Sequence, residues 1–178
     1  MLLLFFAALQ GLLWMITDRP VRGFLLMLSG WALWTFSEYC LHRFLMHQHT
    51  ASGSSSKGIH LYHHQHPNDL KVSGKHRIYL TVLVSFLLFC GSKMNWAFFP
   101  AGFVFGFTFY CFMHFFLHQS RVGVYIPQLY EFHIFHHCRY PNSCYGVSTT
   151  FWDFVFRTCP PENARISERI LSFYKGNH

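Results

Sequence analysis

Four long apolar segments most constrain what this chain can fold into. They run from about residue 2 to 17, 23 to 41, 78 to 90 and 96 to 117. A helix needs about 20 apolar residues to cross a bilayer, so the first and third segments are short and would need flanking residues or a locally thinner bilayer. Short connections, "DRPVR" and "GSKMN", join the segments in pairs. We therefore predict an all-α integral membrane protein with four transmembrane helices in two hairpins.

The composition supports a membrane protein of one domain. Charged residues make up 12% of the 178 residues, about half of their usual share in a soluble domain. Aromatic residues make up 20%, with 22 Phe. The first segment lacks the basic start and the small-residue cleavage site of a secretory signal, so we expect it to be retained. Residues 1–178 are therefore expected to form a single membrane domain.

The distribution of Lys and Arg predicts the orientation. If both short connections face one side, that side carries Arg19, Arg22 and Lys93, and the opposite side carries the other eleven of the 14 Lys and Arg. The positive-inside rule places the eleven in the cytosol, together with both termini and a helical cap at about residues 42–77 and 118–178. The membrane would be the endoplasmic reticulum in a eukaryote and the inner or plasma membrane in a bacterium. The net charge of +7 is then explained by the topology and by attraction of the cytosolic face to anionic lipids. The sequence has no basic–aromatic array of the kind that predicts nucleic acid as a partner.

Fourteen histidines, as many as Lys and Arg combined, are the second unusual feature of the chain. Most fall in four short groups, "HRFLMH", "HLYHH", "HFFLH" and "HIFHH", at the cytosolic ends of the second and fourth predicted helices or in the polar segments that follow. The ten histidines of these groups are His42, His47, His60, His63, His64, His114, His118, His133, His136 and His137. Positions i, i+3 and i+4 share a helix face, so each HxxHH group would project its imidazoles one way. The topology thus collects all ten on the cytosolic face.

Ten histidines exceed the needs of one metal ion, which takes about four to six ligands. They suit two ions with about five nitrogens each, and imidazole is compatible with Fe, Zn, Cu or Ni. His42 and His47 would diverge by about 140° on a regular helix, so they need a helix end, a π-bulge or different metals. The histidines outside the pattern are His49, His66, His76 and His178.

Residues from about Glu38 to Thr158 resemble the fatty acid hydroxylase/sterol desaturase superfamily of membrane di-iron oxygenases. "HLYHHQHPNDLKV" is similar to the HxxHHxxPxDxxRLV segment of the fatty acid (sphingolipid) 2-hydroxylases, with Lys71 near the usual Arg. "HIFHHCRYPNSCYGVSTTFWDFVFRT" is similar to their HxxHH…(F/Y)G(I/V)S…WDxxFGT segment, where Arg157 replaces the usual Gly. The His-x3-His pair in "HFFLH" also fits these enzymes. Within the superfamily, the closest resemblance is to these 2-hydroxylases.

The resemblance implies four transmembrane helices capped by a cytosolic domain, with two metal ions bound by the ten histidines at the membrane face. It implies O2-dependent hydroxylation of an acyl chain, with electrons from cytochrome b5 or another small redox protein. Many relatives carry a fused cytochrome b5 domain with an HPGG haem motif, and this sequence has no such motif. We therefore expect a separate electron donor, such as cytochrome b5 or a ferredoxin-type protein.

The expected chemistry selects the metal and the substrate. Zinc has no redox chemistry, so an oxygenase at this site requires two iron ions with O2 as co-substrate, although zinc can replace iron in preparations. A site at the cytosolic boundary of the membrane meets lipids drawn from the bilayer, whose reactive carbons lie near the headgroup. We therefore expect 2-hydroxylation of a fatty acyl chain, either free or within a sphingolipid or ceramide.

Three carboxylates and the C-terminal tail complete the expectations. Glu38 lies one turn before His42. It is expected either to orient the His42 imidazole without binding the metal itself or to face a water-filled bundle interior. Asp69 in "HPND" and Asp153 in "FWDFVF" are expected to buttress the cytosolic cap. After a Pro pair, the tail places apolar residues at helical spacing, which predicts a short amphipathic helix on the membrane or on the domain.

Two other kinds of function remain open. The first is another branch of the same superfamily, a carotenoid ring hydroxylase or a sterol oxidase or desaturase, although carotenoid hydroxylases usually have a wider third histidine pair than His114/His118. The second is a non-enzymatic metal transporter or sequestering protein. A transporter would need ionisable residues along a transmembrane path, and only Glu38 approaches that description.

Overall fold

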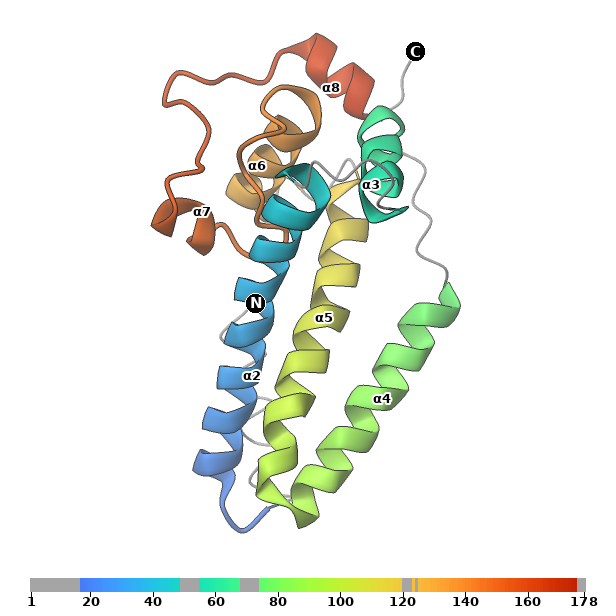
Figure 1. The fold of residues 1–178 in the computed structure, drawn as a ribbon, viewed down its shortest axis with the longest axis vertical. Helices are drawn as coiled ribbons and strands as arrows, with labels where there is room; N and C mark the ends of the chain where they lie inside the picture. The colour runs from blue at the N-terminus through green and yellow to red at the C-terminus, as the bar shows by residue number, and fades with distance from the viewer. Residues whose placement is uncertain (1–16, 49–54, 68–73, 120–122, 124, 176–178) are drawn as a thin grey trace. The chain divides into compact units, whose positions relative to one another are not determined.

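The computed structural model describes residues 17–48, 55–67, 74–119, 123 and 125–175, and every regular element among them is helical (Figure 1). The elements are α2 (Pro20–Cys40), the π-helix η1 (Leu41–Gln48), α3 (Ser55–Gln65), α4 (Gly74–Lys93), the 3-10 helix η2 (Asn95–Ala97), α5 (Phe98–Leu117), α6 (Pro127–Cys138), α7 (Phe151–Val155) and α8 (Glu168–Lys175). The predicted all-α class is therefore confirmed. The predicted first segment at 2–17 lies outside the described residues except for its last position.

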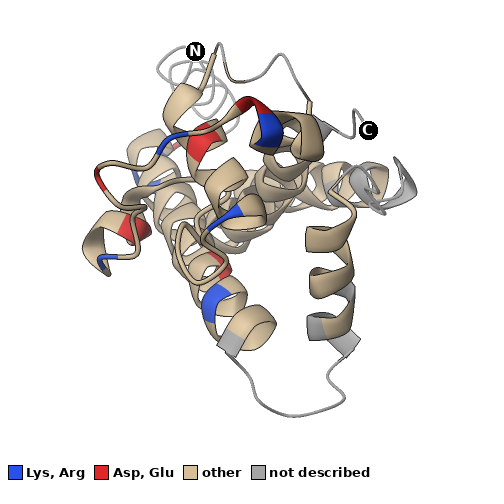
Figure 2. Cartoon of the chain, turned by 90° about the horizontal axis from the view of Figure 1, so that it is seen from above, with Lys and Arg blue, Asp and Glu red and all other residues tan. Residues whose placement is uncertain are grey.

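Three long helices correspond to the other predicted apolar segments. Helices α2 and α5 match the second and fourth segments within a few residues, and α4 extends beyond the third at both ends. Most of the described ribbon carries no charged residue (Figure 2). Within this described part, one helix of 23 residues, Asn95–Leu117, is long and apolar enough to cross a membrane by length and composition, and Thr81–Lys93 is a shorter apolar stretch. The arrangement of four spans stays a prediction.

The chain divides into two compact units, and the first comprises residues 1–34 and 73–109. Its described core lies around Met27 of α2 and Phe98 of α5, which are 3% and 0% exposed, and Leu88 of α4 packs against them. A Cβ atom at Gly102 would lie 2.0 Å from the Met27 carbonyl oxygen. The backbones of α2 and α5 therefore approach too closely at this point for any larger residue, as small residues allow between membrane helices.

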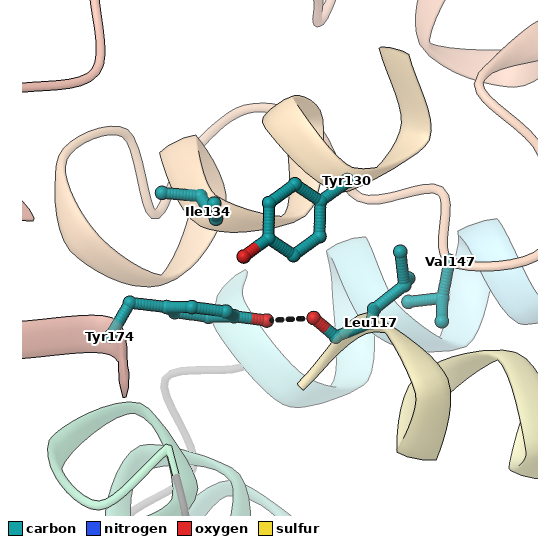
Figure 3. Close-up of a cluster of buried hydrophobic side chains, with 5 residues drawn as sticks. All are labelled: Leu117, Tyr130, Ile134, Val147 and Tyr174. Carbon is teal, nitrogen blue, oxygen red and sulfur yellow. Dashed lines mark hydrogen bonds between the residues drawn. The ribbon is translucent and has the colours of Figure 1, made fainter. Parts of the chain in front are cut away.

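The second unit comprises residues 35–72 and 110–178 and contains all ten clustered histidines. One of its buried clusters joins Leu117, Tyr130, Ile134, Val147 and Tyr174 (Figure 3). The Tyr174 hydroxyl donates a hydrogen bond to the Leu117 carbonyl oxygen at 2.9 Å, which ties α8 to the end of α5. Of the two positions expected for the tail helix, the structure shows packing on the domain.

Candidate metal centre

The π-helix η1 brings together two histidines that a regular α-helix would separate. Hydrogen bonds in a π-helix join residues i and i+5, so side chains five residues apart lie near the same side. The ring centroids of His42 and His47 are 5.2 Å apart, and both side chains belong to one group of imidazoles. Of the three explanations that their spacing left open, the structure shows the π-helical one.

Five histidines from η1, α3 and α6 direct their Nε2 atoms at one another. We call them histidine group A, which consists of His42, His47, His60, His64 and His136. The Nε2 atom of His60 lies 3.1 Å from that of His42 and 2.8 Å from that of His47. The Nε2 atom of His64 lies 2.9 Å from the same His60 atom, and the Nε2 atoms of His47 and His136 are 3.1 Å apart.

Four further histidines form a second set, which we call histidine group B: His63, His114, His118 and His137. In each group the potential ligand atoms all lie within 4.8 Å of one another. The Nε2 atoms of His63 and His114 are 3.0 Å apart. His133, the tenth histidine, adjoins group B, because its Nε2 atom is 3.1 Å from that of His118. All ten predicted histidines therefore lie in or beside these two groups, whereas His66 is exposed and outside both.

Each HxxHH motif divides its histidines between the two groups. In α3, His60 and His64 belong to group A and His63 belongs to group B. In α6, His136 belongs to group A and His137 to group B. The stacked rings of His64 and His137, with centroids 4.4 Å apart, lie where the groups adjoin. Neighbouring residues of one helix thus serve two sites, which explains why both motifs carry adjacent histidines.

The spacing of the Nε2 atoms fits a central cation in group A. A ring nitrogen offers one N–H or one lone pair, so the Nε2 atom of His60 cannot satisfy three neighbouring Nε2 atoms by hydrogen bonding. Ligands at right angles around a metal with bonds of about 2.0–2.1 Å would lie about 2.9 Å apart. The observed separations of 2.8–3.1 Å agree with that value.

In group B, unpartnered ring nitrogens also fit a cation. Both ring nitrogens of His137 are buried and have no hydrogen-bond partner in the described part of the chain. A buried polar atom without a partner is costly, and coordination by a metal would satisfy one of these nitrogens. The donor set consists of imidazoles alone, which suits iron, zinc, copper or nickel.

The protonation of the imidazoles favours metal binding. Burial, followed by the neighbouring His47, lowers the pKa of His42 to about 3, and burial lowers the pKa of His64 to about 4. In group B, burial and the nearby His63 lower the pKa of His118 to about 3. Burial also holds the pKa of His136 well below its ordinary value. These side chains are therefore neutral at pH 7, as metal coordination requires.

Two tyrosines next to the histidines were not predicted as part of the site. Tyr145 is 0% exposed, and its ring centroid lies 5.7 Å from that of His42 and 5.5 Å from that of His47. Tyr174 stacks on His118 with centroids 5.2 Å apart. The "YG" dipeptide at Tyr145 indicates a turn, and the helical spacing of the tail includes Tyr174, but neither pattern predicts a contact with imidazole.

The three carboxylates differ in what the structure shows. The sequence leaves two roles open for Glu38, orienting the His42 imidazole or facing a water-filled bundle interior, and in the structure its carboxylate accepts hydrogen bonds from the backbone of Val147 and Ser148. The His42 Nδ1 atom donates to the Tyr145 carbonyl oxygen at 2.6 Å. Asp153, expected in the cap, is 0% exposed. Asp69 lies outside the described residues.

Comparison with known proteins agrees with this architecture. The family model described as fatty acid hydroxylase matches residues 27–158, a segment that contains all ten histidines. The chain belongs to the fatty acid hydroxylase family.

Two relatives of this family member are named as 2-hydroxylases of a fatty acid or a fatty acyl chain. It is 31% identical to the fatty acid 2-hydroxylase of Mus musculus over 154 residues, which cover 78% of this chain and 40% of the mouse protein. It is 32% identical to the dihydroceramide fatty acyl 2-hydroxylase FAH2 of Arabidopsis thaliana over 148 residues, which cover 76% of this chain and 61% of the plant protein. The chain thus spans about two fifths of the length of the mouse relative.

The fold of this member of the fatty acid hydroxylase family is similar to a solved structure of full-length scs7p in which only the hydroxylase domain is visible. The TM-score is 0.58 at 26% sequence identity, and the match covers 93% of this chain and 66% of the other. The predicted resemblance to fatty acid and sphingolipid 2-hydroxylases is therefore confirmed at the level of the family.

Proposed function

We propose that this protein is an O2-dependent di-iron lipid hydroxylase that adds a hydroxyl group at the 2-position of a fatty acyl chain, either free or within a ceramide or another sphingolipid. The observation that carries the proposal is the division of the histidines into groups A and B, each with its ligand atoms within 4.8 Å of one another. Relatives named fatty acid 2-hydroxylase and dihydroceramide fatty acyl 2-hydroxylase support the substrate class and the position of attack.

In this proposal, group A holds one iron ion, and group B together with His133 holds the other. Bound iron would supply the activation of O2 that attack on a C–H bond requires. The overall reaction places one oxygen atom of O2 in the lipid and releases the other as water, so it consumes two electrons and two protons. We also propose that the electrons come from a separate donor such as cytochrome b5 or a ferredoxin-type protein.

The residues of the chain keep the site ready for this reaction. Neutral imidazoles present Nε2 atoms at the spacing that a metal needs, and the Nδ1 atoms of His42 and His136 donate to the carbonyl oxygens of Tyr145 and Ser143 at 2.6 and 2.7 Å. These hydrogen bonds fix both the ring orientation and the tautomer. The site therefore needs little rearrangement when the metals bind.

We also propose that residues 1–178 form one membrane domain with four spans, and that the histidine groups and both termini face the cytosol. The described helix at Asn95–Leu117 supports one of the spans. The membrane would be the endoplasmic reticulum in a eukaryotic cell and the inner or plasma membrane in a bacterial one. In this arrangement, the substrate reaches the site directly from the bilayer.

Lipid analysis in cells tests the proposal. The protein is produced together with a reductase and cytochrome b5, and acyl chains are profiled by mass spectrometry for the addition of one oxygen atom. We expect 2-hydroxylated chains with the unaltered protein and with His66→Ala, whose exposed side chain lies outside both groups. We expect none with His63→Ala, which removes a member of group B.

Metal analysis of the purified protein completes the test. About two metal ions per chain are expected, with iron supporting activity and zinc giving an inactive form. Unchanged acyl chains in the presence of bound iron and a competent reductant would overturn the hydroxylase. Hydroxylation of a carotenoid or sterol ring instead would place the chain in another branch of its superfamily.

A further inference from the structure

Two buried carboxylates accept hydrogen bonds from four consecutive backbone N–H groups. Asp153 accepts from Tyr145 at 2.8 Å through Oδ1 and from Gly146 at 2.9 Å through Oδ2. Glu38 accepts from Val147 at 2.8 Å and from Ser148 at 2.9 Å, both through Oε1. The two carboxylates, 0% and 4% exposed, therefore fix the backbone of residues 145–148 from two different helices.

This segment in turn fixes two imidazoles of group A. The Tyr145 carbonyl oxygen lies 2.6 Å from His42 Nδ1, and the Ser143 carbonyl oxygen lies 2.7 Å from His136 Nδ1. A carbonyl oxygen can only accept, so both Nδ1 atoms must carry the proton. The Nε2 lone pairs of His42 and His136 are then free to face the centre of group A.

Further contacts hold the segment in one conformation. The hydroxyl of Thr158 donates to Asp153 Oδ1 at 2.7 Å, and its carbonyl oxygen accepts from the Cys144 N–H at 2.7 Å. A Cβ atom at Gly146 would lie 2.0 Å from the Thr149 carbonyl oxygen. No residue with a side chain fits this close approach, so residues 143–148 have little freedom to move.

Three histidines in or beside group B lack such an Nδ1 hydrogen bond in the described part of the chain. The Nδ1 atoms of His118, His133 and His137 are buried and have no hydrogen-bond partner there. The four backbone N–H groups that donate to Glu38 and Asp153 all belong to residues 145–148, the segment beside group A. A disturbance of the two carboxylates should therefore reach one metal site and spare the other.

We propose that Asp153 and Glu38 are positioning residues for the metal held by group A, acting through the backbone of residues 143–148 that orients His42 and His136. The inference rests on the proposed dimetal function and deepens it. It replaces the direct contact expected between Glu38 and His42 with an indirect one, and it assigns Asp153 a role in only one of the two sites.

The hydrogen-bond pattern predicts that the two amide substitutions differ. Both oxygens of Asp153 accept from a backbone N–H, so Asp153→Asn must turn an NH2 group against one of these donors. In Glu38, one oxygen accepts both backbone N–H groups and the other faces only the Ser148 hydroxyl. A glutamine keeps the first acceptor and can donate to the hydroxyl, so Glu38→Gln should be mild, whereas Glu38→Met removes both acceptors.

The test uses zinc(II) as a redox-inert probe on the full chain in detergent. One background carries His118→Ala and His137→Ala, which leaves group A as the binding site, and the other carries His47→Ala and His60→Ala, which leaves group B. Asp153→Asn, Glu38→Met and Glu38→Gln are introduced into each background. Zinc affinity is measured by competition with a chelating dye, and folding is followed by thermal unfolding.

We expect Asp153→Asn and Glu38→Met to weaken zinc binding about 10–100-fold in the group A background, the usual effect of losing a partner that orients a ligand. In the group B background we expect a change of less than about 3-fold, within the scatter of independent sites. The zinc affinity of Glu38→Gln should stay close to that of the unaltered carboxylate in both backgrounds. If Asp153→Asn fails to fold, the contrast between Glu38→Met and Glu38→Gln decides.

Equal losses in both backgrounds would overturn the positioning role and leave the dimetal site standing. Equal effects of Glu38→Met and Glu38→Gln would also overturn it, since the pattern of acceptors would then not matter. If neither background binds zinc before the carboxylates are changed, the proposed dimetal function fails and the positioning role fails with it.

Discussion

Histidine groups A and B use the same side chain at similar spacing, but the surrounding protein holds them in different ways. In group A, backbone carbonyl oxygens accept hydrogen bonds from the Nδ1 atoms of His42 and His136. In group B, aromatic rings stack on the imidazoles: Tyr174 lies on His118 and Tyr110 on His114, with ring centroids 5.2 and 5.7 Å apart. Hydrogen bonds fix both ring angle and tautomer, whereas stacking fixes only the ring plane.

The difference predicts that two sites built from imidazoles alone bind metal with different affinities. A ligand whose tautomer is fixed before binding loses little entropy when the metal arrives. A stacked ligand with an unpartnered Nδ1 atom can still adopt the wrong tautomer. Group A should therefore bind its metal more tightly than group B, although both are needed for the proposed reaction.

The largest expected effect comes from removing one ligand from each group. His60→Ala and His118→Ala should each abolish hydroxylation and lower the metal content by about one ion per chain, because a two-metal site needs both members. The readouts are lipid mass spectrometry and elemental analysis of the purified protein. Activity retained by either variant would contradict a dimetal reaction, and His66→Ala is the matched control because its side chain is exposed and outside both groups.

Substitutions at Tyr174 separate stacking from hydrogen bonding around group B. Tyr174→Ala removes a 1% exposed ring and should lower the free energy of unfolding by about 3–5 kcal/mol, the usual cost of deleting a buried aromatic ring. Tyr174→Phe loses only the hydrogen bond to Leu117 (Figure 3) and should cost about 1 kcal/mol. Thermal unfolding in detergent measures both, and zinc loss confined to group B is expected for the alanine variant. Zinc loss from group A instead would contradict the assignment of Tyr174 to the support of group B.

The pH dependence of stability should have the same sign for both groups. The pKa values of His42 and His118 are lowered to about 3 by burial and neighbouring imidazoles, whereas histidine in an unfolded chain titrates near about 6.5. Below that pH the unfolded chain binds protons that the folded chain does not bind, so the free energy of unfolding falls as the pH falls. Metal-stripped protein should therefore melt at progressively lower temperature from pH 6.5 downward and change little above pH 7. A melting temperature that rises on acidification would contradict this assignment.

Competition with a chelator compares the two groups directly. In the two backgrounds that each retain one group, zinc should bind group A about 10-fold more tightly than group B, because tautomer-fixing partners are worth about this much in affinity. Dissociation constants from dye competition give the ratio. Equal affinities would mean that stacking orients an imidazole as well as a carbonyl oxygen does.

Much of the candidate site could be predicted from the sequence, because its ligands have a residue type and a helical spacing. The HxxHH motifs and the i, i+4 pair His114/His118 indicated helices with imidazoles on one side, and the structure places all of these side chains in or beside the two groups. The five-residue spacing of His42 and His47 left a helix end, a π-bulge or different metals open, and a π-helix is found there. Chemistry-bearing side chains and their periodicity are therefore the predictable part.

The division into groups and the supporting contacts could not be predicted. Whether His63 or His64 joins a given group depends on the rotation of α3 against α6, which no local pattern encodes. The partners of His42 and His136 are carbonyl oxygens of Tyr145 and Ser143, and every residue has a carbonyl oxygen. Nothing in the local sequence therefore connects Glu38 with the backbone that it contacts, more than a hundred residues later in the chain.

The smallest expected effect concerns the departure from the family pattern at Arg157. This residue has φ 56°, in the left-handed region where a side chain costs about 1–2 kcal/mol. Glycine, which the related 2-hydroxylases usually have at this position, fits there without strain. Because glycine also gains entropy in the unfolded chain, Arg157→Gly should raise the free energy of unfolding by only about 0.5–1 kcal/mol. Arg157→Ala is the matched control, since it removes the same charge but keeps the Cβ atom, and it should give no stabilisation. Thermal unfolding measures the change in stability. Arg157 adjoins Thr158, the hydrogen-bond partner of Asp153. Any increase in zinc affinity should therefore appear in the background that retains group A and not in the one that retains group B.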